Sequence, residues 1–179
     1  DPLAPNLKHA LIEMYLASDR TADAVSVAEE VERLPAKGPE VIAICGLVYL
    51  STGDLRRARE ALEELGALDR GVSAVGIPLR LALDAATGDL DDARGLLHRL
   101  LSQYSGGHTV SAYLIGEAYK TIGDYDEAFD WWTRSIERYE GWAFSVMTVR
   151  NRNHPVIGKD PRFLALLKRM GLEGERDEK

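Results

Sequence analysis

One short pattern recurs along this chain at a nearly constant spacing, and this periodicity constrains the fold more than any other feature. The pattern is Gly, Asp, Leu or Tyr, two charged residues and Ala, at residues 53–58, 88–93 and 123–128. The alanines that end these copies are 93 − 58 = 35 and 128 − 93 = 35 residues apart. A fainter copy at residues 19–24 ends 58 − 24 = 34 residues before Ala58. A fixed period of this length predicts an array of small structural repeats.

Each repeat is predicted to consist of two helices joined by a tight turn. In the second repeat Pro39 begins a helix, Gly53 ends it, and Asp54 is placed to cap the next helix. Small residues in both helices would let them cross closely, where larger side chains would hold them apart. The residues expected on the facing sides are Ile42, Cys45, Gly46 and Tyr49 in the first helix, and Ala58, Leu62 and Leu65 in the second.

These features resemble the tetratricopeptide repeat, a helix–turn–helix unit of about 34 residues. That family favours a small residue and then an aromatic one in the first helix, and an alanine followed by a large apolar residue in the second. The third repeat departs from the pattern, with Leu81 and Asp84 at the small and aromatic positions and Pro78 in its first turn. The matching residues are Gly46, Tyr49, Ala58 and Leu62 in the second repeat, Gly116, Tyr119, Ala128 and Trp132 in the fourth, and Tyr15 and Ala24 in the first.

The resemblance implies an all-α fold, a right-handed α-solenoid of about four such repeats over residues 5–142. The expected repeats are residues 5–38, 39–73, 74–108 and 109–142, followed by a capping segment at 143–172 and a disordered tail at 173–179. A helix is expected at 143–150, and another begins at Asp160 and Pro161, which suit a cap and a first helical position. This last helix would cover the end of the apolar core, as a solenoid requires.

Residues 159–172 also look like the closing motif of tetratricopeptide regions in multidomain bacterial signalling proteins. The chain begins at Asp1 with no methionine. These two features support an alternative interpretation, in which the chain is one domain of a longer signalling protein.

The composition predicts a cytoplasmic protein with neither nucleic acid nor membrane as its direct partner. The net charge of −7 disfavours phosphate binding, and no apolar run is long enough to span a membrane. The start of the sequence lacks a secretory signal, and the single cysteine, Cys45, excludes an internal disulfide.

No pattern in the sequence predicts catalysis, so we expect a chain that is not an enzyme and has no catalytic residues, no cofactor and no metal. Phosphate-binding loops and metalloprotease or esterase motifs are absent, and no two of the four histidines are three or four residues apart. Cys45 is expected to be a buried, unreactive thiol and Trp132 a core residue. For Trp131 we expect either contact with the terminal segment or partial exposure. The basic carboxyl end is read as a solvated surface or as a patch for an acidic partner, and it comprises Arg150, Arg152, Lys159, Arg162, Lys168 and Arg169.

In the resembled family, the first helices of successive repeats line a concave groove. The middle of this groove would be apolar here, which suits an amphipathic or extended peptide. Some relatives hold a chaperone tail through lysine and asparagine, and those positions here carry other residues, so we do not expect that ligand. The predicted groove residues are His9, Glu13, Leu47, Leu50, Leu79, Ala82, Ala86, Tyr113, Glu117 and Lys120.

The sequence therefore favours a protein–protein interaction scaffold that binds a peptide or a partner domain in this groove. A regulatory or sensory domain of a larger bacterial signalling protein or transcriptional regulator is the alternative. Two other occupants of the groove stay open, namely a flanking segment of the same chain and a second copy in a homo-oligomer. An RNA-binding helical repeat is disfavoured by the apolar groove and by the negative net charge.

Overall fold

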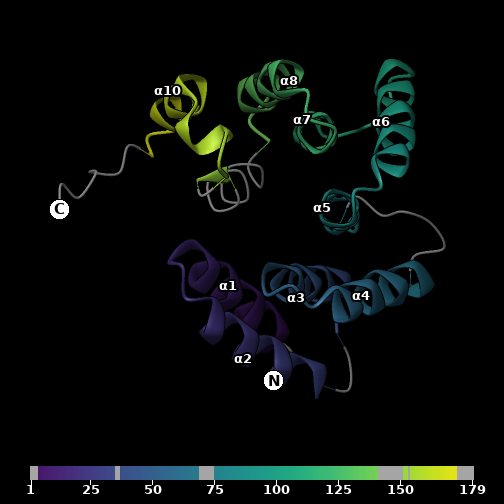
Figure 1. The fold of residues 1–179 in the computed structure, drawn as a ribbon, viewed down its shortest axis with the longest axis vertical. Coiled ribbons are helices and arrows are strands. Elements are labelled where there is room, and N and C mark those ends of the chain that lie inside the picture. The colour runs from purple at the N-terminus through teal and green to yellow at the C-terminus, as the bar shows by residue number, and fades with distance from the viewer. Residues whose placement is uncertain (1–3, 35–36, 69–74, 141–150, 153, 173–179) are drawn as a thin grey trace. The chain divides into compact units, whose positions relative to one another are not determined.

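The computed structural model describes residues 4–34, 37–68, 75–140, 151–152 and 154–172, and within these the structure is helical with no strand (Figure 1). The all-α class predicted from the sequence is thus confirmed for the described residues. The chain divides into two compact units, Asp1–Leu96 and Leu97–Lys179, and each is described by itself.

The four repeated segments each contain the predicted pair of helices. The second helices of the pairs begin at Thr21, Leu55, Leu90 and Tyr125, which are 34, 35 and 35 residues apart. The helices are α1 (Ala4–Ala17), α2 (Thr21–Glu32), α3 (Pro39–Ser51), α4 (Leu55–Leu68), α5 (Ile77–Thr87), α6 (Leu90–Ser105), α7 (Ala112–Thr121), α8 (Tyr125–Glu137), the short 3-10 helix η1 (Ile157–Lys159) and α10 (Pro161–Arg169).

The repeated Gly-Asp pair forms the turn inside each of the last three helix pairs. Its glycines have φ angles of +80°, +76° and +87°, a left-handed conformation that a Cβ atom disfavours. The aspartate that follows caps the second helix, because its side chain accepts from a backbone N–H three residues later, at 3.0 to 3.4 Å. In the fainter first copy, Asp19 takes the left-handed position with φ of +55°, and Arg20 provides no side-chain cap. This difference explains why the first copy looks weaker in the sequence.

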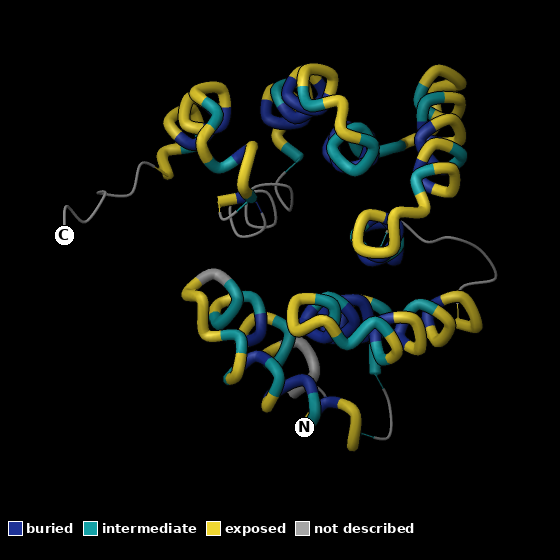
Figure 2. Tube along the Cα trace, viewed as in Figure 1, coloured by how far each residue is buried: buried dark blue, intermediate teal, exposed yellow. Residues whose placement is uncertain are grey.

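The core of the first unit is built around α3, which contacts α1, α2, α4 and α5. Figure 2 shows α3 buried along most of its length. Gly46 lies where α5 meets α3. A Cβ at Gly46 would lie 2.5 Å from Cδ2 of Leu79 and 3.0 Å from Cβ of Ala61, so only glycine allows this approach.

In the second unit, α7 packs on α8 through a close contact between Gly116 and Trp132. A Cβ at Gly116 would lie 2.5 Å from Cδ1 of the Trp132 ring, and Trp132 is fully buried. The predicted core role of Trp132 is therefore confirmed. Trp131 is also buried, with its ring edge-on to Tyr104 at 4.9 Å and Arg134 over its face at 4.5 Å. The partial exposure considered for Trp131 from the sequence is wrong.

The closing helix α10 packs on α8. Asp160 caps α10 by accepting from the backbone N–H of Arg162 at 2.8 Å, as the sequence predicts. Phe163, Leu166 and Leu167 are buried, so α10 covers apolar surface within its own unit. The helix expected at 143–150 and the tail expected at 173–179 lie outside the described residues.

We predict opposite effects for two glycine-to-alanine changes in helices. Gly116→Ala should lower the free energy of unfolding by about 1 to 3 kcal/mol, because the added Cβ meets a rigid indole ring. Gly66→Ala should raise it by about 0.5 to 1 kcal/mol, because Gly66 has open space around it and alanine favours the helix. Thermal unfolding followed by circular dichroism measures both. A Gly116→Ala variant as stable as the native chain would contradict the close packing of α7 on α8.

Candidate functional site

Seven of the ten predicted groove residues belong to the first unit, on the first helices of three successive pairs. Helix α1 contacts α3, and α3 contacts α5. The structure therefore places these residues on helices that adjoin one another in chain order. They are His9 and Glu13 on α1, Leu47 and Leu50 on α3, and Leu79, Ala82 and Ala86 on α5.

The exposure of these residues divides them into two groups. Leu47, Leu50 and Ala82 are half-buried and Ala86 is exposed, so each presents some apolar surface. Leu79, by contrast, is fully buried, because its side chain fills the space left by Gly46 on α3. Leu79 holds α5 onto α3, and it has no surface to offer a partner in this conformation.

The two polar members on α1 lie one helical turn apart. Nε2 of His9 is 3.9 Å from Oε1 of Glu13, and both side chains are about one-third exposed. This pair adds polar groups to α1, the helix that contacts α3.

The other three predicted groove residues lie on α7 in the second unit. Tyr113 is fully buried, and only 3% of Glu117 is exposed. Nζ of Lys120 donates to Oε2 of Glu117 at 2.5 Å and to Oδ1 of Asn151 at 3.1 Å. The structure thus joins Glu117 and Lys120 with Asn151 in a buried polar cluster. Asn151 was not predicted, because no spacing or motif connects it to α7.

Two polar atoms of this cluster lack a hydrogen-bond partner within the described part of the chain. Oε1 of Glu117 and Nδ2 of Asn151 are buried and have no hydrogen-bond partner among those residues. Lys120 carries the charge that balances the Glu117 carboxylate, so removal of its ammonium group would leave a buried charge uncompensated.

His154 lies near this cluster and holds a tight turn. Its Nδ1 accepts from the backbone N–H groups of Val156 and Ile157, at 3.3 and 3.2 Å. Burial lowers the pKa of His154, and the positive charge of Lys120 lowers it further. The neutral imidazole is therefore the form that the fold favours.

Cys45 has the environment of a structural thiol. It is buried, and this burial raises its pKa to about 12, so the reactive thiolate is disfavoured near neutral pH. The expectation of a buried thiol is confirmed. In the ranges that the structure describes, no three His, Cys, Asp or Glu side chains come together as a metal site.

Part of the basic carboxyl end pairs with acidic residues of α8. Arg162 donates to Asp126 at 2.7 Å, and Arg169 donates to Glu137 at 3.3 Å. The guanidinium of Arg162 also lies over the ring of Phe129 at 4.3 Å. These two arginines therefore attach α10 to α8, and Arg150 lies outside the described residues.

None of the helices in the described part of the chain is both long and apolar enough to cross a membrane. No protein-family model, no curated protein and no solved structure matches the chain.

We predict that Lys120→Met lowers the free energy of unfolding by about 3 kcal/mol, because Glu117 then keeps a buried charge without its cation. The double variant Glu117→Gln with Lys120→Met should recover part of this loss, because it removes both charges. Urea unfolding followed by circular dichroism compares the three proteins. Equal stability of Lys120→Met and the native chain would show that the pair is not buried in solution.

We also predict that acid destabilises the protein through His154. Because its folded pKa lies below the unfolded value of about 6.5, the unfolded chain binds the proton more tightly. The contribution of His154 is then fully present above about pH 6.5 and is lost as the pH falls through the folded pKa. The melting temperature should fall less between pH 7.5 and pH 5 in His154→Asn than in the native chain, since the asparagine oxygen can accept in place of Nδ1. An NMR titration of His154 with an ordinary histidine pKa would contradict this.

Proposed function

We propose that this chain is a non-enzymatic interaction module of the tetratricopeptide type, which binds an amphipathic or extended segment of a partner protein. The observation that carries the proposal is the adjoining set of first helices, α1, α3 and α5. Leu47, Leu50 and Ala82 are only half-buried on these helices, and Ala86 is exposed. We call the accessible residues of this set the first-helix face, which comprises His9, Glu13, Leu47, Leu50, Ala82 and Ala86.

The chemistry of this face suits a peptide with an apolar side. Helices satisfy their own backbone hydrogen bonds, so a partner would gain affinity from side-chain contacts, not from backbone pairing. Leu47 and Leu50 lie three residues apart on α3 and offer an apolar centre, with the polar His9 and Glu13 pair on the neighbouring helix. An apolar centre with a polar edge is the usual composition of a protein interface.

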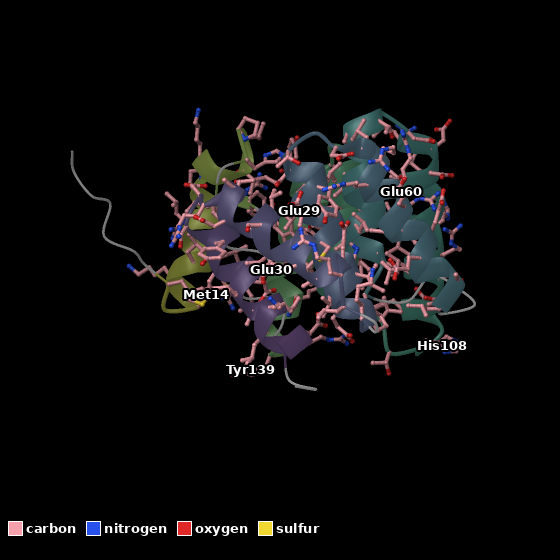
Figure 3. All side chains as sticks on the ribbon, turned by 90° about the horizontal axis from the view of Figure 1, so that it is seen from below. Met14, Glu29, Glu30, Glu60, His108 and Tyr139 are labelled. Atoms are coloured by element: carbon pink, nitrogen blue, oxygen red, sulfur yellow. The ribbon has the colours of Figure 1, made fainter. Side chains whose placement is uncertain are left out.

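A second apolar surface in the same unit supplies a control. Leu7, Leu11 and Met14 are exposed by 65%, 37% and 66%, and their spacing of four and three residues places them on one side of α1. Figure 3 labels Met14 on this helix. The stripe occupies a single helix, whereas the first-helix face extends over three. We therefore assign partner binding to the first-helix face.

A regulatory or sensory domain of a larger bacterial signalling protein is the second candidate. The observation that favours it is a charged cavity between α4 and α5, which would suit a small ligand better than a peptide. In that case the repeats would transmit the bound state to other domains.

The first proposal predicts selective loss of a partner in a pull-down from the source organism's lysate, read by mass spectrometry. Leu47→Glu with Leu50→Glu should remove the partner, because two carboxylates would enter the apolar centre of the face. The control, Leu7→Glu with Met14→Glu, adds the same charge to the exposed stripe of α1. Circular dichroism must show that both variants are folded. Leu79 is excluded as a target because a glutamate at this buried position would unfold the contact between α3 and α5.

Loss of a partner in the first variant alone would support the first-helix face. Loss in the control alone would move the binding site to the stripe on α1. A partner retained by both variants would refute apolar binding in this unit.

A further inference from the structure

The cavity between α4 and α5 lies in the first unit and has a volume of about 550 Å³. Its lining combines two leucines with side chains of both charges. Arg59 and Leu62 come from α4, Arg80, Leu83 and Asp84 come from α5, and Asp89 comes from the turn that follows. No residue of this lining belongs to the first-helix face.

Asp84 is the unusual member of the lining, because it is a carboxylate with only 5% of its surface exposed. Its Oδ1 accepts from Nε of Arg80 at 3.2 Å, and its Oδ2 has no partner in the described part of the chain. Arg80 is moreover shared with a second carboxylate, because its guanidinium also contacts Asp92. Burial raises the pKa of Asp84, although the positive charge of Arg80 acts in the opposite direction.

A buried carboxylate oxygen without a donor costs free energy. The second and fourth repeats of this chain have Tyr49 and Tyr119 at the matching position, so the repeat pattern does not explain an aspartate here. Rotation about the χ2 angle of aspartate is soft, and it can turn an oxygen toward the cavity that Asp84 lines. A ligand with a positively charged donor would supply the missing hydrogen bond.

Arg59 lines the same cavity and would bind a negatively charged group of a ligand. Its side chain is exposed on α4 and pairs with no carboxylate in the ranges that the structure describes. A guanidinium group recognises a carboxylate through paired hydrogen bonds. Leu62 and Leu83 add apolar surface to the same lining.

We propose that this cavity binds a small zwitterion with a primary ammonium group and a carboxylate on an aliphatic body, such as a free aliphatic α-amino acid. Asp84 accepts from the ammonium group, with Asp89 adding negative charge nearby. Arg59 holds the ligand carboxylate, and the aliphatic body lies against Leu62 and Leu83. This site does not depend on partner binding at the first-helix face, and it supplies the ligand that a sensory role would need.

Three probes of nearly equal shape test the proposal on the full chain. L-leucine carries both charges, isoamylamine carries only the ammonium group, and 4-methylpentanoate carries only the carboxylate. Isothermal titration calorimetry gives their affinities, and the rise in melting temperature with probe concentration gives an independent measure. We expect L-leucine to bind most tightly, isoamylamine more weakly and 4-methylpentanoate not at all.

Two substitutions assign the roles. Asp84→Asn should weaken L-leucine binding by about 10-fold or more, because it removes a charged hydrogen bond from a buried site. Arg59→Gln should reduce the affinity for L-leucine to that for isoamylamine, while leaving isoamylamine binding unchanged. Asp91→Asn is the matched control, since Asp91 follows the same turn, is 94% exposed and does not line the cavity.

The proposal is overturned if L-leucine neither releases heat nor raises the melting temperature at about 10 mM. It is equally overturned if 4-methylpentanoate binds as tightly as L-leucine, or if Asp84→Asn binds L-leucine like the native chain. If Asp84→Asn does not fold, the order of the affinities of the three probes for the native chain tests the proposal. A pull-down that fails at the first-helix face leaves all of these outcomes unaffected.

Discussion

The structure depends on close contact between helices at a few positions where no side chain larger than hydrogen fits. At Gly46 the atoms of Leu79 and Ala61 occupy the space of a Cβ, and at Gly116 the ring of Trp132 does so. A large side chain from the neighbouring helix can then pack against the backbone of the glycine helix and become fully buried. Both units contain such a contact, with the aliphatic side chain of Leu79 in the first and the aromatic ring of Trp132 in the second. The close contact joins α3 to the next helix pair in the first unit, and it joins the two helices of one pair in the second unit.

The Gly-Asp turn determines where one helix stops and the next begins. A left-handed glycine ends the first helix, and the aspartate that follows satisfies a free N–H of the second. Because this turn recurs at a fixed interval, the packing positions that surround it recur as well. Ala58, Ala93 and Ala128 are all fully buried for this reason. Local backbone chemistry and tertiary packing therefore agree at each repeat, as is typical of a chain with one dominant fold.

In each unit, polar residues occupy some positions where the repeat pattern predicts core residues. We call these positions breaks in the pattern, and they are the chemically distinctive features of the molecule. In the first unit Asp84 stands at a position that the repeat pattern gives to an aromatic ring, and it borders a cavity. In the second unit Glu117 and Lys120 form a buried pair on α7 and recruit Asn151. Each break costs stability unless its hydrogen bonds are completed. The two breaks differ in origin, because the first opens onto a cavity and the second holds two segments of its unit together.

The sequence by itself determined the helix pairs, their turns, the cap at Asp160 and the burial of Cys45 and Trp132, because these follow from local backbone preference and from the period of the apolar residues. Only the tertiary structure decided which predicted groove residues have surface to offer. Leu79 and Leu47 belong to the same sequence pattern, yet Leu79 is buried because α5 meets α3 at Gly46. It also decided that Trp131 is buried, that Asn151 reaches Lys120, and that Oδ2 of Asp84 has no partner among the described residues. Each of these depends on contacts between residues that are distant in the sequence. The period of the apolar residues in a helix does not predict such contacts.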